Sequence, residues 1–182
     1  MLEALITSKT RIKLLLKFFL NSKNTGYLRS LEPEFGESTN AIRLELNRFE
    51  EAGLLHSSFQ NKKKIFQANT QHPLFPELQN LLRKHVGLDE IVERVINQLG
   101  KLEEVYLVGE LARGNDSNKI ELWFVGEELD EEYLKQLIQK AQKFIKRKLS
   151  YKIVNRKEIE GSIAGKNKNE ILLLWEALGQ YN

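Results

Sequence analysis

The sequence contains no cysteine and only three histidines. Without cysteine there can be no disulfide framework and no thiolate metal site. The histidines, His56, His72 and His85, are too scattered for the paired i, i+4 spacing of a helical metal site. We therefore expect no metal and no other cofactor.

Long apolar runs are also missing. No stretch approaches membrane-spanning length, and the N-terminal MLEALITSKTRIK lacks the apolar core of a signal peptide. We expect a cytoplasmic protein with no membrane partner. Hydrophobic residues make up 41% and charged residues 29% of the chain, as in globular proteins.

Basic and acidic residues are unevenly distributed along the chain. Residues 1–85 carry 13 Lys/Arg and 8 Asp/Glu, a balance of +5, whereas residues 86–182 carry 15 and 17, a balance of −2. A basic first half favours contact with a polyanion there. Ordinary surface charge is the alternative.

Three helices are predicted in the first half. Residues 8–21 repeat apolar side chains at helical spacing, and residues 27–34 form a short second helix. Ser38 can cap a third helix, whose core stripe is Ile42, Leu46 and Phe49 and which ends near Gly53. A short helix, a tight turn and a longer helix make a helix-turn-helix.

Two strand-like runs follow, at residues 54–59 and 64–68, joined by the basic tip Gln-Asn-Lys-Lys at 60–63. Three helices and a basic hairpin, with Glu-Glu-Ala-Gly-Leu-Leu at 50–55 before the hairpin, resemble the winged helix-turn-helix of bacterial arsenic- and antibiotic-resistance repressors. The resemblance covers residues 8–70 and implies a DNA-binding transcriptional regulator whose partner is double-stranded DNA.

A recognition helix meets base edges in the major groove through its outward-facing side chains, and a wing contacts phosphates or the minor groove. The DNA-binding residues predicted on this basis are Ser38, Thr39, Asn40, Arg43 and Asn47 in the helix, and Lys62, Lys63 and Lys64 in the wing. The alternatives are a solvated helix face, lysines that protect a sheet edge, and a winged helix that binds protein.

Residues 73–100 read as two connector helices, the first starting near Pro76 and the second spanning 88–99. They could pair two protomers in a homodimer suited to a palindromic operator, or pack only on their own chain. We divide the chain into a winged helix-turn-helix domain at 1–72, connector helices at 73–100 and a second domain at 101–182.

The second domain opens on VYLVGELARGNDSNKIELWFVG at 105–126, two apolar strands around a polar loop. It resembles the nucleotide-binding hairpin of the minimal nucleotidyltransferases of the DNA polymerase β superfamily. Matching residues are Gly109, Ala112, Arg113, Gly114, Ile120 and Leu122. At the functional positions Glu110 replaces a serine, while Lys119 and Glu121 replace the two aspartates.

The remaining elements predicted are a helix at 127–148, a strand at 151–154 and a strand at 171–175, with a terminal helix as the alternative for the last. Nucleotidyl transfer in the family needs two metals held by paired carboxylates. Lys119 would repel such a metal, and the third strand offers Lys152 instead of a carboxylate. We expect Lys119 to form a salt bridge with Glu121, and Arg113 to pair with Glu121 or Glu110.

The sequence therefore predicts an α+β protein: an N-terminal winged helix-turn-helix followed by a small mixed-sheet nucleotidyltransferase-like α/β domain. We expect a bacterial transcription regulator that is not an enzyme. Its second domain would be a degenerate pseudoenzyme site at Gly109, Glu110, Arg113, Lys119 and Glu121 that serves dimerisation or the sensing of an unknown effector or protein. The alternative is an active or residual nucleotidyltransferase that modifies a protein or small molecule.

Overall fold

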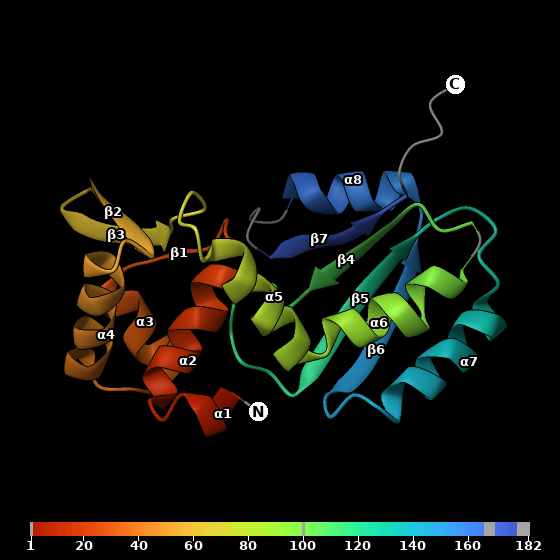
Figure 1. Ribbon diagram of the computed structural model, residues 1–182. Helices are drawn as coiled ribbons and strands as arrows, with labels where there is room; N and C mark the ends of the chain where they lie inside the picture. The colour runs from red at the N-terminus through yellow and green to blue at the C-terminus, as the bar shows by residue number, and fades with distance from the viewer. Residues whose placement is uncertain (1, 100, 166–169, 178–182) are drawn as a thin grey trace. The chain divides into compact units, whose positions relative to one another are not determined.

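A computed structural model describes residues 2–99, 101–165 and 170–177 (Figure 1). The chain forms two compact units. Unit 1 comprises Met1–His85 together with Arg113–Asp116, and unit 2 comprises Val86–Ala112 and Ser117–Asn182. The domain boundaries expected from the sequence, at 72/73 and 100/101, stay predictions.

The helices of unit 1 largely match expectation. After α1 (Leu2–Leu5), α2 (Lys9–Leu15) starts at Ser8, whose hydroxyl accepts the Arg11 N–H, and continues as a π-helical turn over Leu16–Leu20. Next come α3 (Leu28–Phe35), α4 (Thr39–Glu51) and α5 (Phe75–Val86). The chain leaves α4 through Gly53, which has a φ of +72° that glycine tolerates without strain.

A three-stranded sheet completes unit 1, with strand order β1-β3-β2. β2 (Leu55–Gln60) and β3 (Lys63–Ala68) pair antiparallel around a two-residue turn, and β3 also pairs with β1 (Thr25–Gly26). The sequence missed β1, which is only two residues long. It also made the turn four residues long, whereas only Asn61 and Lys62 lie outside the strands.

The core of unit 1 gathers around the π-helical turn. Phe18 and Phe19 are fully buried, and the Phe19 ring meets Phe49 of α4 edge-on at 6.4 Å between centroids. Ile42, Leu46 and Phe49 form the buried stripe of α4, as predicted. This packing fixes which face of α4 is left for solvent.

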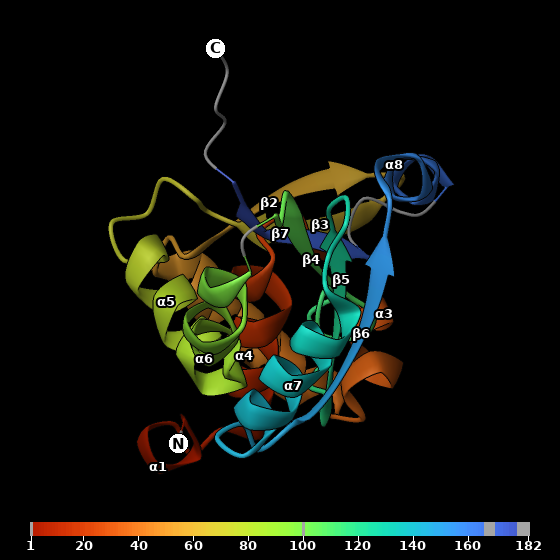
Figure 2. The same ribbon diagram turned by 90° about the vertical axis from the view of Figure 1, so that its right-hand side faces the viewer.

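Unit 2 is a mixed four-stranded sheet, with helices on both faces and strand order β6-β5-β4-β7 (Figures 1 and 2). Its strands are β4 (Glu104–Val108), β5 (Lys119–Val125), β6 (Lys148–Val154) and β7 (Ile171–Glu176). β5 runs antiparallel to β4 and parallel to β6. The parallel pair is joined by α7 (Glu131–Gln142), the crossover that parallel strands require. β7 confirms the strand predicted at 171–175.

The two faces of this sheet carry different side chains. Ile120, Leu122 and Phe124 of β5 are buried, on the face where α6 (Leu88–Arg94) and α7 lie. On the other face Ile159 of α8 (Arg156–Gly165) clusters with Val125 and Val154. The sequence did not predict α8, which buries one residue, Ile159, and has no strong apolar stripe.

Two helices were predicted with wrong bounds. The helix expected over 127–148 begins after Asp130, which caps it, and ends at Gln142. There the Gln142 side-chain amide donates to the Ile145 and Arg147 carbonyls and accepts a hydrogen bond from the Leu149 N–H. These side-chain bonds take the place of the backbone bonds that a further helical turn would form. The helix expected over 88–99 ends at Arg94, and a short 3₁₀ turn follows at Ile96–Gln98. Among the described residues no helix combines the length and apolar character needed to cross a membrane.

Candidate functional site

A hollow in unit 1 brings together residues that the sequence placed on two separate elements. It measures about 480 Å³ and lies between α4, the start of α3 and the β2–β3 hairpin. Its lining is Tyr27, Leu28, Arg29, Arg43, Leu46, Asn47, Lys62, Lys63, Lys64 and Phe66. Five of these ten side chains are basic and none is acidic, so the hollow suits an anionic ligand.

Helix α4 supplies one wall. Ser38 caps it by accepting the Ala41 N–H at 3.2 Å, which fixes where the helix begins. With the apolar stripe buried, Asn40, Arg43 and Asn47 are exposed on the opposite side, as predicted. The Arg43 guanidinium donates to Asn40 Oδ1 at 2.8 Å, which positions it along the helix surface.

Two predicted contact residues are engaged within the fold. The Ser38 hydroxyl serves the cap, and the Thr39 hydroxyl donates to Glu32 Oε2 at 2.5 Å. The Thr39 bond therefore joins α4 to α3, whereas the Ser38 bond stays within α4. Neither side chain lines the hollow, whereas Arg43 and Asn47 do.

The hairpin supplies the other wall. The Lys63 ammonium lies 4.5 Å from the centre of the Tyr27 ring and 3.4 Å from its hydroxyl. Lys64 donates to Glu50 Oε2 at 2.6 Å, and the Ser57 hydroxyl donates to the other oxygen of Glu50. These bonds lower the pKa of Glu50 and tie the hairpin to the end of α4. Lys62 is exposed in the turn.

Sequence reasoning missed Tyr27 and Arg29. Tyr27 precedes α3 and comes to the hollow because its neighbours Thr25 and Gly26 pair with β3. Arg29 follows in the first turn of α3 and is exposed. The one available signal was an aromatic residue and a basic residue close together before the predicted turn.

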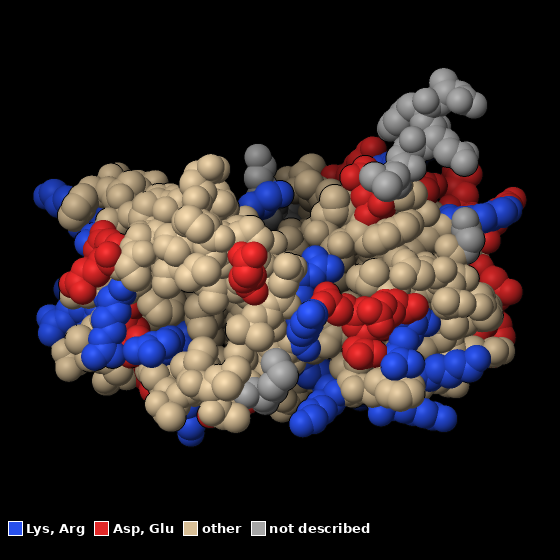
Figure 3. All heavy atoms as spheres, in the orientation of Figure 1, with Lys and Arg blue, Asp and Glu red and all other residues tan. Residues whose placement is uncertain are grey.

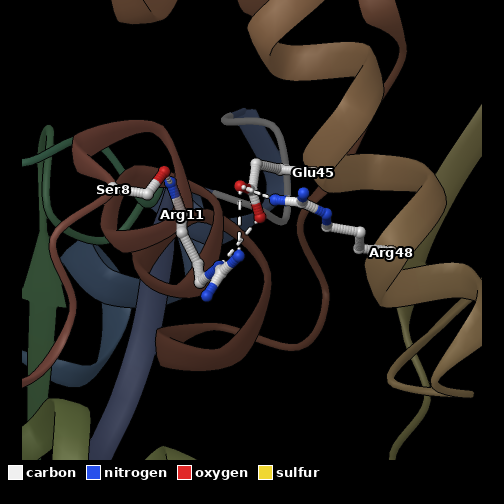
Figure 4. Close-up of polar contacts among 4 residues, drawn as sticks. All are labelled: Ser8, Arg11, Glu45 and Arg48. Carbon is white, nitrogen blue, oxygen red and sulfur yellow. Dashed lines mark hydrogen bonds and ion pairs between the residues drawn. The ribbon is translucent and has the colours of Figure 1, made fainter.

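Ion pairs around the buried carboxylate of Glu45 hold α4 against α2 (Figure 4). Glu45 lies on the core side of α4 and is 5% exposed. Arg11 donates to both of its carboxylate oxygens, at 2.8 and 3.2 Å, and Arg48 donates at 2.9 Å. Burial by itself raises the pKa of Glu45, but the bonds and charge of Arg11 and Arg48 outweigh it, so the pKa lies below its usual value.

The surface charge follows the same pattern. Figure 3 shows basic side chains gathered over α4 and the β2–β3 hairpin, with some acidic side chains among them. Over unit 2 the two signs are mixed. Part of the excess of basic over acidic residues in 1–85 therefore lies on the elements that line the hollow.

Strands β4 and β5 are the two central strands of the unit 2 sheet. β4 and β5 pair with Val108 opposite Glu121, and the chain turns at Gly109, whose φ is +76°. A Cβ atom at Gly109 would lie only 2.8 Å from Glu121 Oε1, so glycine is needed for the carboxylate to lie against the turn. The predicted salt bridge is confirmed: Lys119 Nζ lies 3.0 Å from Glu121 Oε2.

The other residues of the predicted degenerate site lie in the loop. Glu110 is exposed, and Arg113 groups with unit 1, where its carbonyl accepts from the buried Lys17 amine at 3.0 Å. Glu121 belongs to unit 2. The pairing expected for Arg113, with Glu121 or Glu110, stays a prediction.

The donor set does not fit the two-metal site of nucleotidyl transfer. Two metals need several carboxylates, but Glu121 shares its face of the sheet with Ser150 and with the ammonium of Lys119. Within the described residues, no three His, Cys, Asp or Glu side chains come together as a metal-binding group.

A second polar cluster lies further along the same face. Glu104 is buried, and its carboxylate accepts a hydrogen bond from the Tyr106 hydroxyl at 2.7 Å. Arg156 of α8 donates to the other carboxylate oxygen at 2.5 Å. Burial and the bond to Glu104 raise the pKa of Tyr106 well above its usual value. Because Arg156 also lies 3.4 Å from Glu103, the cluster fastens α8 to the sheet.

Comparisons with known proteins give little more. No protein-family profile and no curated protein matches the chain. Among solved structures, the chain is similar to the crystal structure of a "putative nucleotidyltransferase" from Sulfolobus solfataricus. The two are 26% identical, the match covers 54% of this chain and 86% of the other, and the TM-score is 0.36.

This comparison gives the chain a distant nucleotidyltransferase-like structural neighbour and nothing finer. It contradicts the prediction that the protein is not an enzyme, because the neighbour's description points toward enzymatic function. That prediction was wrong. It rested on the substituted residues Glu110, Lys119 and Glu121, and on Lys152 in place of a carboxylate on the third strand.

Proposed function

We propose that the protein binds double-stranded DNA through unit 1, acting as a winged helix that presents α4 to the major groove. The observation that carries this proposal is the basic hollow between α4 and the β2–β3 hairpin. Regulation of transcription is the activity that such binding would serve.

The chemistry of the lining supports a nucleic acid. Arg43 and Asn47, one helical turn apart, offer the donors that pair with guanine and adenine edges. Lys62 and Lys63 at the hairpin turn are placed for phosphate contacts, which position a protein on the duplex without reading its sequence. Two walls of different chemistry thus match the two kinds of contact that specific binding needs.

Salt dependence tests the proposal directly. We expect the affinity for labelled duplex DNA, measured by fluorescence anisotropy, to fall linearly on logarithmic axes with salt, with a slope of about −0.9 per phosphate contact. Replacing Arg43, Lys62 and Lys63 together by alanine should abolish most of the binding and flatten this slope.

The matched control removes the same charge elsewhere. Lys140, Lys143 and Lys146 are exposed in and after α7 of unit 2, and their replacement by alanine should leave the affinity nearly unchanged. A salt-independent affinity, or equal losses in both triple variants, would show that unit 1 does not bind DNA in this way.

A second candidate function is nucleotidyl transfer by unit 2, which requires Glu121 to hold a metal together with a second ligand that the sequence does not identify. The observation that favours it is the position of the Glu121 carboxylate, which lies against the Gly109 turn at the head of the hairpin. In the resembled family the corresponding strand position carries a functional carboxylate.

Incubation with radiolabelled nucleoside triphosphates and either Mg²⁺ or Mn²⁺ tests this candidate. Incorporation into protein, nucleic acid or a small acceptor should disappear in Glu121→Gln and persist in Glu131→Gln, which alters an exposed carboxylate in the first turn of α7. Incorporation that survives Glu121→Gln, or that is absent from the wild type, would refute the candidate.

A further inference from the structure

Leu44 is an apolar side chain on the polar face of α4. It is 49% exposed, whereas Ile42 and Leu46 on either side of it are buried. Successive helical residues are about 100° apart, so Leu44 lies on the face of Asn40 and Asn47, four residues before it and three after it. Packing in the core therefore does not explain why a large apolar residue occupies position 44.

We infer that Leu44 reads the C5-methyl group of thymine and so makes unit 1 selective for A·T base pairs. The inference rests on the proposed DNA binding. In the major groove thymine is the base that presents a methyl group, and apolar side chains recognise it by contact. A leucine between two asparagines sets a methyl-binding group beside side chains suited to adenine.

The neighbours of Leu44 supply complementary chemistry. Asn47 lines the hollow, and an asparagine amide can pair with both N6 and N7 of adenine. Asn40 accepts from Arg43, which leaves the guanidinium anchored beside the same surface. Asn47 and Leu44, one helical turn apart on α4, could thus contact an adenine on one strand and the methyl group of a neighbouring thymine.

Exchange of thymine for uracil tests the inference, because it removes the methyl group and keeps every base-pairing atom. The probe is the tightest duplex selected from a random pool by the full chain, prepared with thymine and with uracil. We expect the wild type to bind the uracil duplex about fourfold more weakly for each thymine that Leu44 contacts, the factor that corresponds to one buried carbon.

Variants separate the methyl contact from other effects of uracil on the duplex. Leu44→Ala should bind the thymine duplex more weakly than the wild type and should no longer distinguish the two duplexes. Leu74→Ala removes a side chain of similar exposure, 55%, just before α5 and should behave as the wild type. Unchanged melting temperatures would show that both variants are folded.

The possible results differ in what they overturn. If the wild type binds both duplexes equally, or if Leu44→Ala remains sensitive to the exchange, Leu44 does not read the methyl group, while DNA binding stands. If no duplex binds at any salt concentration, the proposed function falls and takes this inference with it.

Discussion

Glu45 shows how one side chain fixes the position of α4, the helix that we propose enters the major groove. Its carboxylate is buried, and Arg11 and Arg48 hold its pKa below the usual value against the opposing effect of burial. Because the pKa is lower in the folded than in the unfolded chain, the stabilisation is present above the unfolded value of about 4.3. It is lost as the pH falls through the folded value.

We therefore expect Glu45→Gln to lower the free energy of unfolding by about 1–2 kcal/mol at pH 7, less than for a fully buried pair because both arginines are partly exposed. Chemical denaturation of both proteins between pH 3 and 8 measures this. The difference should stay constant above pH 6 and shrink below about pH 4. Glu51→Gln, an exposed carboxylate of the same helix, should show neither effect. A pH-independent difference would contradict the ion-pair explanation.

Single residues of the candidate site could be predicted where periodicity fixed their direction. Arg43 and Asn47 are exposed because Ile42, Leu46 and Phe49 are buried, and that stripe is visible in the sequence. The cap formed by Ser38 was predicted, because a serine just before an apolar helical stripe is a common helix start. The bond from Thr39 to Glu32 was not predictable in the same way, because the two residues lie on different helices.

At the scale of elements, the β2–β3 turn combines backbone strain with proposed function. Asn61 and Lys62 both have positive φ, 48° and 63°, as in the two-residue turns that match the twist of a hairpin. Asparagine tolerates this conformation, but lysine does so at a cost of about 1–2 kcal/mol. The lysine at this position lowers stability, and the proposed phosphate contact would account for it.

Lys62→Gly should therefore shift stability and affinity in opposite directions. We expect the melting temperature to rise by a few degrees, corresponding to about 1 kcal/mol, because glycine adopts positive φ freely. The affinity for duplex DNA should fall. The slope of log affinity against log salt should become shallower by about 0.9, the value for one phosphate contact. Asn61→Gly is the control, with little change in either quantity. A more stable variant with unchanged affinity would remove Lys62 from the interface.

The elements that the sequence predicted are those stabilised by a repeated apolar pattern, such as α4 and β5. Those that it missed depend on a few distant contacts. β1 exists through two residues paired with β3, and α8 is held by Ile159 and by Arg156 at Glu104. The end of α7 was misplaced because Phe144 and Ile145 continue the helical spacing beyond Gln142, although Phe144 is 59% exposed.

On the scale of the whole molecule, each of the two units is built from two separate stretches of the chain. The chain passes between the units after residues 85, 112 and 116, so the loop 113–116 belongs to unit 1 although its flanking strands belong to unit 2. Sequence reasoning treated 105–126 as one hairpin in one domain. It could not foresee that Gly114 contacts Lys17, because the two residues are almost a hundred positions apart and neither belongs to an apolar pattern.

Gly114 gives this division a testable consequence. A Cβ atom at Gly114 would lie 2.5 Å from Lys17 Cα and 2.7 Å from its carbonyl oxygen, both in the backbone, and φ is +84°. Gly36, at the end of α3, also has positive φ, +62°, but no atom within 4 Å of the added Cβ. The two glycines thus share the conformational constraint and differ in the close approach.

We expect Gly36→Ala to lower the free energy of unfolding by about 1 kcal/mol through backbone strain alone. Gly114→Ala should cost at least about 2 kcal/mol more, because the displaced atoms belong to the π-helical turn at the core of unit 1 and cannot yield as a flexible side chain would. Denaturant unfolding of the full chain, followed for each variant, measures both costs. Equal costs would mean that the loop does not pack on Lys17, and residues 113–116 would then belong with the strands that flank them.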